Sequence, residues 1–314
     1  MYLLDVAGFL VLFALPLAPG LLEILRPRDN SSLNLNTGYS RNPRFFGDSM
    51  RAKVAPLLAE ERTDFARRVP FLGRRGEYAR IGEKIAIPRG KTTDEVLLAF
   101  DHLDARAGAS FLDGYGIGSV KAGARARART LLSDGDVRIG DGCTIGRWVD
   151  AGGTLSVGER CDLGRSASAQ RVVLGRGTRF ARVFGTPITT AGCGVASDTR
   201  ETQAVEAGDI VDRESVRIAD GRRIGGSVKS YGSLVIGAGA HIHGNAIARG
   251  NITIEPGARV DGHVFSEGRL AIGADVCIGT AGSNRTAYGA LAVTIASGAS
   301  IFGWLVSDGR GFVA

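Results

Sequence analysis

The sequence predicts an all-β protein, a single-stranded solenoid β-helix of about 18 residues per turn, and three observations support this fold class. Aliphatic residues recur every 18 positions through the C-terminal third of the chain. Glycine fills 46 of 314 positions while aromatic residues make up 7%, which is typical of small aliphatic cores joined by tight corners. Apolar and polar residues alternate over short runs, which is the periodicity of a β-strand.

The repeat is clearest in four copies that align without gaps. Each copy has two aliphatic anchors, and each anchor recurs once per period, so equivalent anchors are evenly spaced along the chain. So short a unit cannot bury its own apolar face, and each turn must therefore stack on its neighbours in ladders of equivalent residues. The first anchors are Ile218, Ile236, Ile254 and Ile272, the second are Ile224, Ile242, Val260 and Ile278, and a fifth copy has Ile295 and Ile301.

The pattern continues upstream with a break. Ile139, Val157 and Leu174 follow one another at nearly the same spacing, and Val120 and Leu103 lie about one and two periods before Ile139. Thr92 and Glu95 also fit a capping box that would make residues 92–104 a helix, but we favour strand. The expected segments are N-terminal turns over 96–182, an insertion over 183–215 with a short helix near Thr199–Val205, and C-terminal turns over 216–314.

The N-terminus is apolar. Seventeen uncharged residues separate Asp5 from Glu23, and Arg26 and Arg28 follow as flanking cations. This pattern predicts a transmembrane or membrane-anchoring helix over 1–25, re-entrant or spanning because of its prolines, with the rest of the chain on the cytoplasmic side of the inner membrane. A buried soluble helix is the alternative.

Residues 26–95 form a basic juxtamembrane segment. Residues 26–91 carry 15 Lys/Arg and 7 Asp/Glu, so the excess charge lies beside the apolar run and favours membrane lipid over nucleic acid as a partner. Ser49–Arg68 is expected to form an amphipathic helix, either solvated or lying on anionic lipid.

Few residues suggest chemistry. His241, His243 and His263 cluster on two adjacent turns and fit an acyltransferase base, a metal pair or plain surface residues; we favour the last. Cys143 and Cys161 occupy equivalent positions, which predicts inward-facing small residues rather than a redox pair. We therefore expect no catalytic residue, no cofactor and no metal.

The segments IGAGAHIHG, IEPGARVDG and IASGASIFG resemble the repeats of the bactofilins, polymer-forming bacterial cytoskeletal proteins. The resemblance covers residues 218–314 well and 131–182 more loosely. It implies a right-handed β-helix, end-to-end self-association without nucleotide, attachment to the inner membrane, and service as a non-enzymatic scaffold for cell-wall or polysaccharide machinery. A longer, interrupted solenoid and the marked apolar N-terminus depart from the family pattern.

The alternative function is a hexapeptide-repeat acyltransferase on a left-handed β-helix, because three hexapeptides make a turn of the same length. Against it, Ser230, Ala248 and Ser266 stand where aliphatic residues belong. For the scaffold, the last repeat runs to the end of the chain without a charged cap. We expect Phe302, Trp304, Leu305 and Phe312 to lie at an open end and to mediate self-association.

Overall fold

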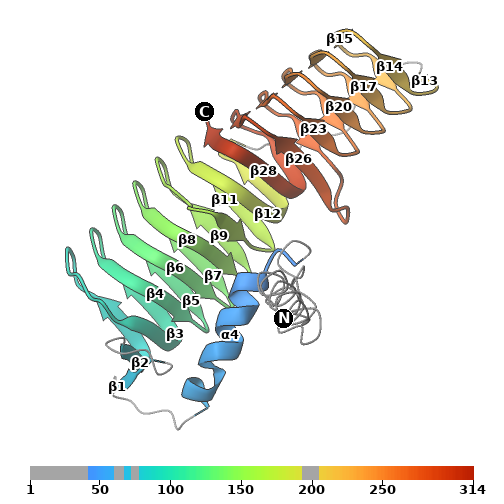
Figure 1. Cartoon of the computed structure of the whole chain (residues 1–314). Coiled ribbons are helices and arrows are strands. Elements are labelled where there is room, and N and C mark those ends of the chain that lie inside the picture. Colours follow the sequence, from blue (N-terminus) through green and yellow to red (C-terminus); the bar gives the residue numbers. More distant parts are fainter. Residues whose placement is uncertain (1–41, 60–66, 72–77, 193–204) are drawn as a thin grey trace, which may run out of the picture. The chain divides into compact units, whose positions relative to one another are not determined.

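The computed structural model describes residues 42–59, 67–71, 78–192 and 205–314. Residues 43–314 form one compact unit, an all-β single-stranded solenoid with about 12 turns of about 18 residues (Figure 1). The apolar segment 1–25, Arg26, Arg28 and most of the Thr199–Val205 helix prediction lie outside the described residues. Among the helices that the structure describes, none is long and apolar enough to cross a bilayer.

The solenoid consists of two coils, and the first begins earlier than expected. Its first turn is β2 (Tyr78–Ile87), which pairs in parallel with β3 (Val96–Ala105), so residues 92–104 form no helix. The later strands are β4 (Ser110–Gly116), β5 (Ser119–Ala122), β6 (Arg127–Ser133), β7 (Asp136–Ile139), β8 (Thr144–Ala151), β9 (Thr154–Val157), β10 (Ser166–Ser168), β11 (Arg171–Leu174) and β12 (Arg179–Thr190).

The first coil is held together by parallel ladders of buried aliphatic residues. Ile139 pairs with Val157, and Val157 pairs with Leu174, as their spacing predicts. Val120 pairs with Val137 rather than Ile139. The shift is two residues and preserves the inward orientation, because alternate residues of a strand share a face.

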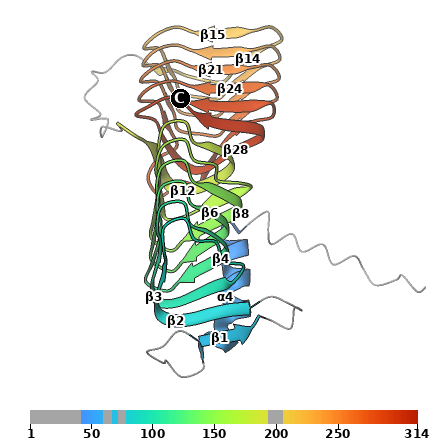
Figure 2. The same cartoon turned by 90° about the vertical axis from the view of Figure 1, so that its left-hand side faces the viewer.

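The second coil follows the 18-residue repeat without interruption through four turns. Ile218, Ile236, Ile254 and Ile272 pair in one continuous ladder that Ile295 extends, and the second anchors form another that ends at Ile301. All these residues are buried, so the predicted register is confirmed. Figure 2 shows these strands stacked one above another.

Each turn of the second coil is built from short strands. They are β13 (Val205–Glu206), β14 (Ile210–Asp212), β15 (Val216–Ile218), β16 (Arg223–Ile224), β17 (Val228–Ser230), β18 (Leu234–Ile236), β19 (His241–Ile242), β20 (Ala246–Ala248), β21 (Ile252–Ile254), β22 (Arg259–Val260), β23 (Val264–Ser266), β24 (Arg269–Ile272), β25 (Cys277–Ile278), β26 (Arg285–Gly289), β27 (Ala292–Ile295) and β28 (Ser300–Val313).

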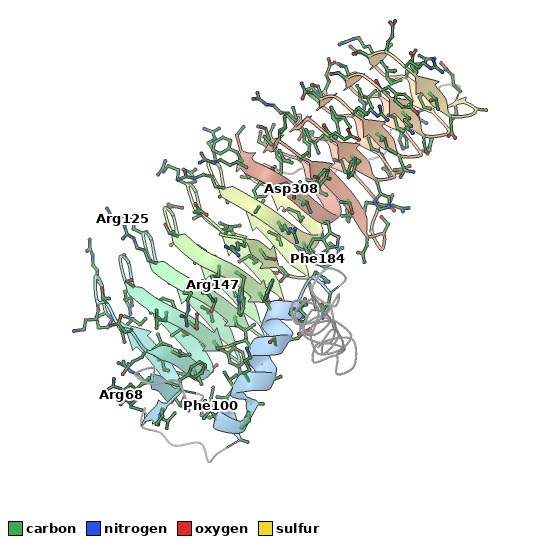
Figure 3. All side chains as sticks on the ribbon, in the orientation of Figure 1. Arg68, Phe100, Arg125, Arg147, Phe184 and Asp308 are labelled. Carbon is green, nitrogen blue, oxygen red and sulfur yellow. The ribbon has the colours of Figure 1, made fainter. Side chains whose placement is uncertain are left out.

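One corner of each turn places a residue in the left-handed region, as the glycine content predicts. Glycine fills it at Gly90 and Gly142, among others, but Arg125 and Arg160 adopt φ values of 59° and 53° there. Arg125 projects from its corner in Figure 3. Cys143 and Cys161, predicted to point inward beside this corner, are buried, and so are the equivalent small residues Ala240, Ala258 and Ala299.

The two coils run toward each other rather than forming one interrupted solenoid. β12, the last turn of the first coil, pairs antiparallel with β28, the last turn of the second. The insertion expected over 183–215 is therefore wrong at both ends: residues 183–190 belong to β12, and β13 and β14 already form the outer turn of the second coil. A repeat pattern fixes the spacing of turns, and a reversal of coil direction leaves that spacing unchanged.

Helix α4 (Phe45–Leu58) and strand β1 (Arg67–Pro70) belong to the first coil. The helix expected over Ser49–Arg68 thus begins earlier and ends earlier. Its Val54 is fully buried in a cluster with Leu98 and Leu132 of the coil. The apolar face of this helix packs on protein, which corrects both the solvated and the lipid-bound interpretation for residues 49–58.

Candidate assembly surfaces

The C-terminal turn is covered, contrary to the sequence-based expectation. Leu305 is fully buried opposite Val183, and the Trp304 ring lies 5.0 Å from the Phe184 ring between centroids. Phe302 is half-buried, and Phe312 is 43% exposed opposite Arg179. The predicted open end is therefore wrong, because β12 of the same chain pairs with β28 there. This corrects the placement of Phe302, Trp304, Leu305 and Phe312.

Backbone and corner contacts close this junction. The Phe180 ring packs directly on the backbone of β28 at Gly311. A Cβ atom at position 311 would lie only 2.1 Å from this ring, so the position requires glycine. The Thr190 hydroxyl donates to the carbonyl oxygen of Ala296 at 2.9 Å and accepts from the Ala299 N–H at 3.1 Å. The junction is thus a packed interface between two coil ends, with the strand pairing of a sheet interior.

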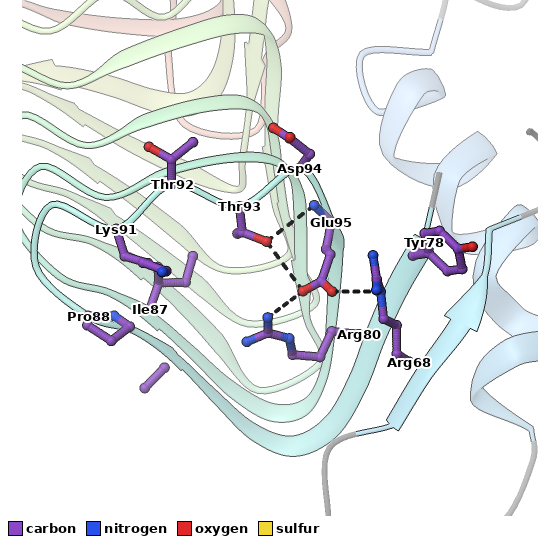
Figure 4. A pocket seen from close by; sticks show the side chains of 11 residues that line it. Arg68, Tyr78, Arg80, Ile87, Pro88, Lys91, Thr92, Thr93, Asp94 and Glu95 are labelled. Carbon is purple, nitrogen blue, oxygen red and sulfur yellow. Dashed lines mark hydrogen bonds and ion pairs between the residues drawn. The ribbon is translucent and has the colours of Figure 1, made fainter. Parts of the chain in front are cut away.

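The N-terminal end of the first coil is partly capped. β1 pairs antiparallel with the first half of β2, from Tyr78 to Ile81. Glu95 fastens this cap, because its carboxylate forms ion pairs with Arg68 of β1, at 3.0 Å, and with Arg80 of β2 (Figure 4). These side chains line a hollow of 620 Å³, in which Glu95 pairs with both arginines.

Helix α4 is fixed to the same coil by a buried carboxylate. Asp150 is 1% exposed and receives hydrogen bonds from Arg44, at 2.8 and 3.0 Å, and from Arg51, at 2.9 Å. Arg51 also contacts Asp134 at 2.6 Å, and Tyr115 donates its hydroxyl to the same carboxylate at 2.7 Å. Burial and this hydrogen bond raise the pKa of Tyr115 well above its ordinary value.

A second hollow of 810 Å³ lies between α4 and the coil. Its lining combines aromatic residues with cations, and Arg129 among them is paired with the buried carboxylate of Asp113. Arg147 and Arg165 are exposed on neighbouring turns. The other lining side chains include Phe46, Lys53 and Trp148.

The outer turn of the second coil is uncovered among the described residues. β13, β14 and β15 each pair with one neighbouring strand only: β16, β17 and β18. The Ile210 N–H donates to Ser227 and the Asp212 carbonyl accepts from Tyr231, both at 2.9 Å. Backbone groups of successive strand residues point to opposite edges, so Val211 turns its N–H and C=O to the outer edge. Its side chain is 64% exposed.

Sequence reasoning missed this edge because Val211 belongs to the segment taken as an insertion. The pattern does contain a signal: Ile210 and Val216 precede Val228 and Leu234 by one repeat period. Extending the repeat backward by one period would have placed the outer turn.

The predicted histidine cluster forms in part. His241 and His243 both direct a ring nitrogen at Asp261, whereas the His263 Nδ1 accepts the Thr286 N–H at 3.1 Å. Burial lowers the pKa of His241 despite its carboxylate partner. For Asp261, burial opposes ionisation, but hydrogen bonds from Arg259 and His241 outweigh it and lower its pKa. Asp261 was not predicted from the sequence, although it lies one repeat period after His243.

Comparison with known proteins found no matching family model, no matching curated protein and no matching solved structure.

Proposed function

We propose that this chain is a bactofilin-like structural scaffold of the bacterial cell envelope, with a right-handed coil, that self-associates through the outer turn of its second coil, residues 205–218. The observation that carries the proposal is the edge at Val211, which no strand among the described residues covers. An unpaired strand edge is a template for another strand. Within the chain, the ends of the two coils already pair in an antiparallel way, through β12 and β28, so a similar pairing between two chains is geometrically feasible.

The occupant we propose is a second copy of the chain. Its own outer turn offers the same unpaired backbone groups, and the turn carries charges of both signs: Asp212 and Glu214 against Arg213 and Arg217. Mixed charges allow opposite signs to face each other when the turn pairs with itself. The first coil offers a poorer partner, because β1 covers part of its end.

Proline at position 211 tests this edge. Val211→Pro removes only the outward N–H and places its ring where an incoming strand would lie, while the bonds of Ile210 and Asp212 to β17 remain. Val211→Thr is the matched control, since it keeps the N–H and a β-branched side chain. Light scattering on the full chain in detergent should give dimers for the wild type and the Thr variant, and monomers for the Pro variant. A monomeric wild type at high concentration would refute self-association.

The second part of the proposal is anchoring at the inner membrane by residues 1–25, with the coils in the cytoplasm and with lipid and envelope machinery as partners. It is supported by the uncharged run and the cations Arg26 and Arg28 that follow it. Deletion of residues 1–28 should move the protein to the soluble fraction. A periplasmic reporter that is active when fused after Ala314 would contradict this orientation.

A further inference from the structure

Three metal-ligating side chains share one outer face of the second coil. Ile242 and Val260 point inward and are fully buried, so the residues on either side of each point outward. His241 pairs in register with Arg259, and Ile242 pairs with Val260. This alternation, together with the register, places the outward-facing His241 and His243 of one turn beside the outward-facing Asp261 of the next.

The ligand atoms converge on one point. His241 Nε2 lies 2.8 Å and His243 Nδ1 lies 3.1 Å from the same oxygen, Oδ2 of Asp261. The two imidazole rings are 4.0 Å apart between centroids, and the three ligand atoms all lie within 4.8 Å of one another. The other carboxylate oxygen, Oδ1, accepts a 2.7 Å hydrogen bond from Arg259.

We propose that His241, His243 and Asp261 bind a divalent transition-metal ion of the Zn²⁺ class. Two imidazoles and a carboxylate at bond lengths of about 2.0–2.2 Å are a common zinc ligand set. Tetrahedral coordination needs ligand atoms about 3.3 Å apart. The two His–Asp separations of 2.8 and 3.1 Å therefore have to open by a few tenths of an ångström, and the two imidazole nitrogens, which lie within 4.8 Å of each other, have to settle at the same distance. Rotation of two partly exposed imidazoles supplies this movement.

The neighbouring groups support such a site. Arg259 holds Oδ1 and thereby orients Oδ2 toward the imidazoles, as outer-shell partners of ligating carboxylates do. His243 is exposed, so solvent reaches the ion and a water supplies the fourth ligand. The bound ion would link β19 to β22 and so fasten two successive turns, independently of the association edge at Val211.

The experiment measures Zn²⁺ binding to the full chain in detergent after removal of metal with a chelator. Competition with a chromophoric chelator should give one tight equivalent per chain. His243→Ala and Asp261→Asn should each weaken binding more than roughly 100-fold, beyond the ~10–100-fold that loss of an outer-shell partner costs. His102→Ala is the matched control, because His102 contacts Asp101 at 3.0 Å without a second histidine, and it should bind as the wild type does.

X-ray absorption at the zinc edge gives a readout that does not depend on variant folding. The wild type should show only nitrogen and oxygen ligands, two of them imidazoles. Less than half an equivalent bound to the wild type, or sulfur in the coordination shell, would overturn the proposal. Unchanged affinity in a folded His243→Ala, Asp261→Asn double variant would do the same.

Discussion

The antiparallel junction between β12 and β28 can be tested by a disulfide between Phe184 and Trp304. The two residues are directly opposite in register, and both side chains are half-buried on the outer face. Directly opposed antiparallel residues have Cα atoms about 4.5–5.5 Å apart, within the ~4.4–6.8 Å that a disulfide spans. A Phe184→Cys, Trp304→Cys chain should therefore form an intrachain bridge on mild oxidation.

The expected gain is large because the bridge closes a long loop. For about 120 residues between the two positions, the chain-entropy relation gives an upper value of about 5 kcal/mol. Comparing oxidised and reduced forms of the same variant cancels the cost of losing the aromatic pair. At roughly 2–4 °C per kcal/mol, the oxidised form should melt about 10 °C higher, and a reductant should abolish the difference.

The assay is non-reducing electrophoresis with mass spectrometry of the linked peptides, in a background with Cys193 and Cys277 replaced by serine. Phe184→Cys with Val306→Cys is the control, because Val306 lies opposite Arg182. That diagonal separates the residues by about 7–8 Å, beyond disulfide reach. Equal bridging in the control, or bridges only between two chains, would refute the intrachain register.

Four further outcomes follow from single positions. Ile254→Ala should lower the free energy of unfolding by about 2–5 kcal/mol in chemical denaturation, because Ile254 is 1% exposed, whereas exposed Thr253→Ala should change it by less than about 0.5 kcal/mol. Asp150→Asn should cost about 1.5–3 kcal/mol and make α4 sensitive to trypsin, since two partly exposed arginines lose their charged hydrogen-bond partner; a resistant helix would contradict its anchoring role. Tyr115 has a raised pKa, so its stabilising contribution is complete below about pH 10 and is lost as the pH rises further; Tyr115→Phe should flatten the alkaline fall in Tm. Gly90→Ala should cost about 1 kcal/mol by thermal melting, because φ is 68° and no atom lies within 4 Å of the added Cβ; an unchanged Tm would show that the corner relaxes.

The ladders of the second coil could be predicted because a parallel stack requires equal spacing. Ile236, Ile254 and Ile272 occupy the same inward position on successive turns. Residues that stack in one ladder must recur at an equal spacing, so the spacing alone identifies them. The first coil was harder to predict. Its turns vary in length, since Ala167 pairs with Val149 on one side and with the sequentially nearer Val183 on the other. Its first strand, β2, also has a register irregularity after Gly82.

The reversal between the coils could not be predicted from the repeat. The alternation around Val183 and Leu305 is the same whether the strands run parallel or antiparallel, because both arrangements point every second residue inward. The covering of the C-terminal turn, and with it the loss of the predicted open end at Leu305, is a long-range contact between residues far apart in the sequence. The local alternation of apolar and polar residues gives no information about such a contact.

Antiparallel closure of the two last turns constrains any assembly through coil ends. Both C-terminal turns are used within the chain, so β13–β15 and the outer edge of β2 are the coil ends that remain among the described residues. Both are N-terminal ends, and two strands that meet at such ends are antiparallel, as β12 and β28 are. A contact of the β13–β15 edge with its own copy is therefore two-fold and closes as a dimer.

Growth beyond a dimer needs the β2 edge as well, which β1 half covers. The Glu95→Gln variant removes the ion pairs that fasten β1. It should therefore shift full-length chains from dimers to larger assemblies in light scattering. The double variant Glu95→Gln, Val211→Pro should form only dimers, paired through β2. If Glu95→Gln leaves the mass distribution unchanged while proteolysis shows β1 released, the β2 edge takes no part in assembly.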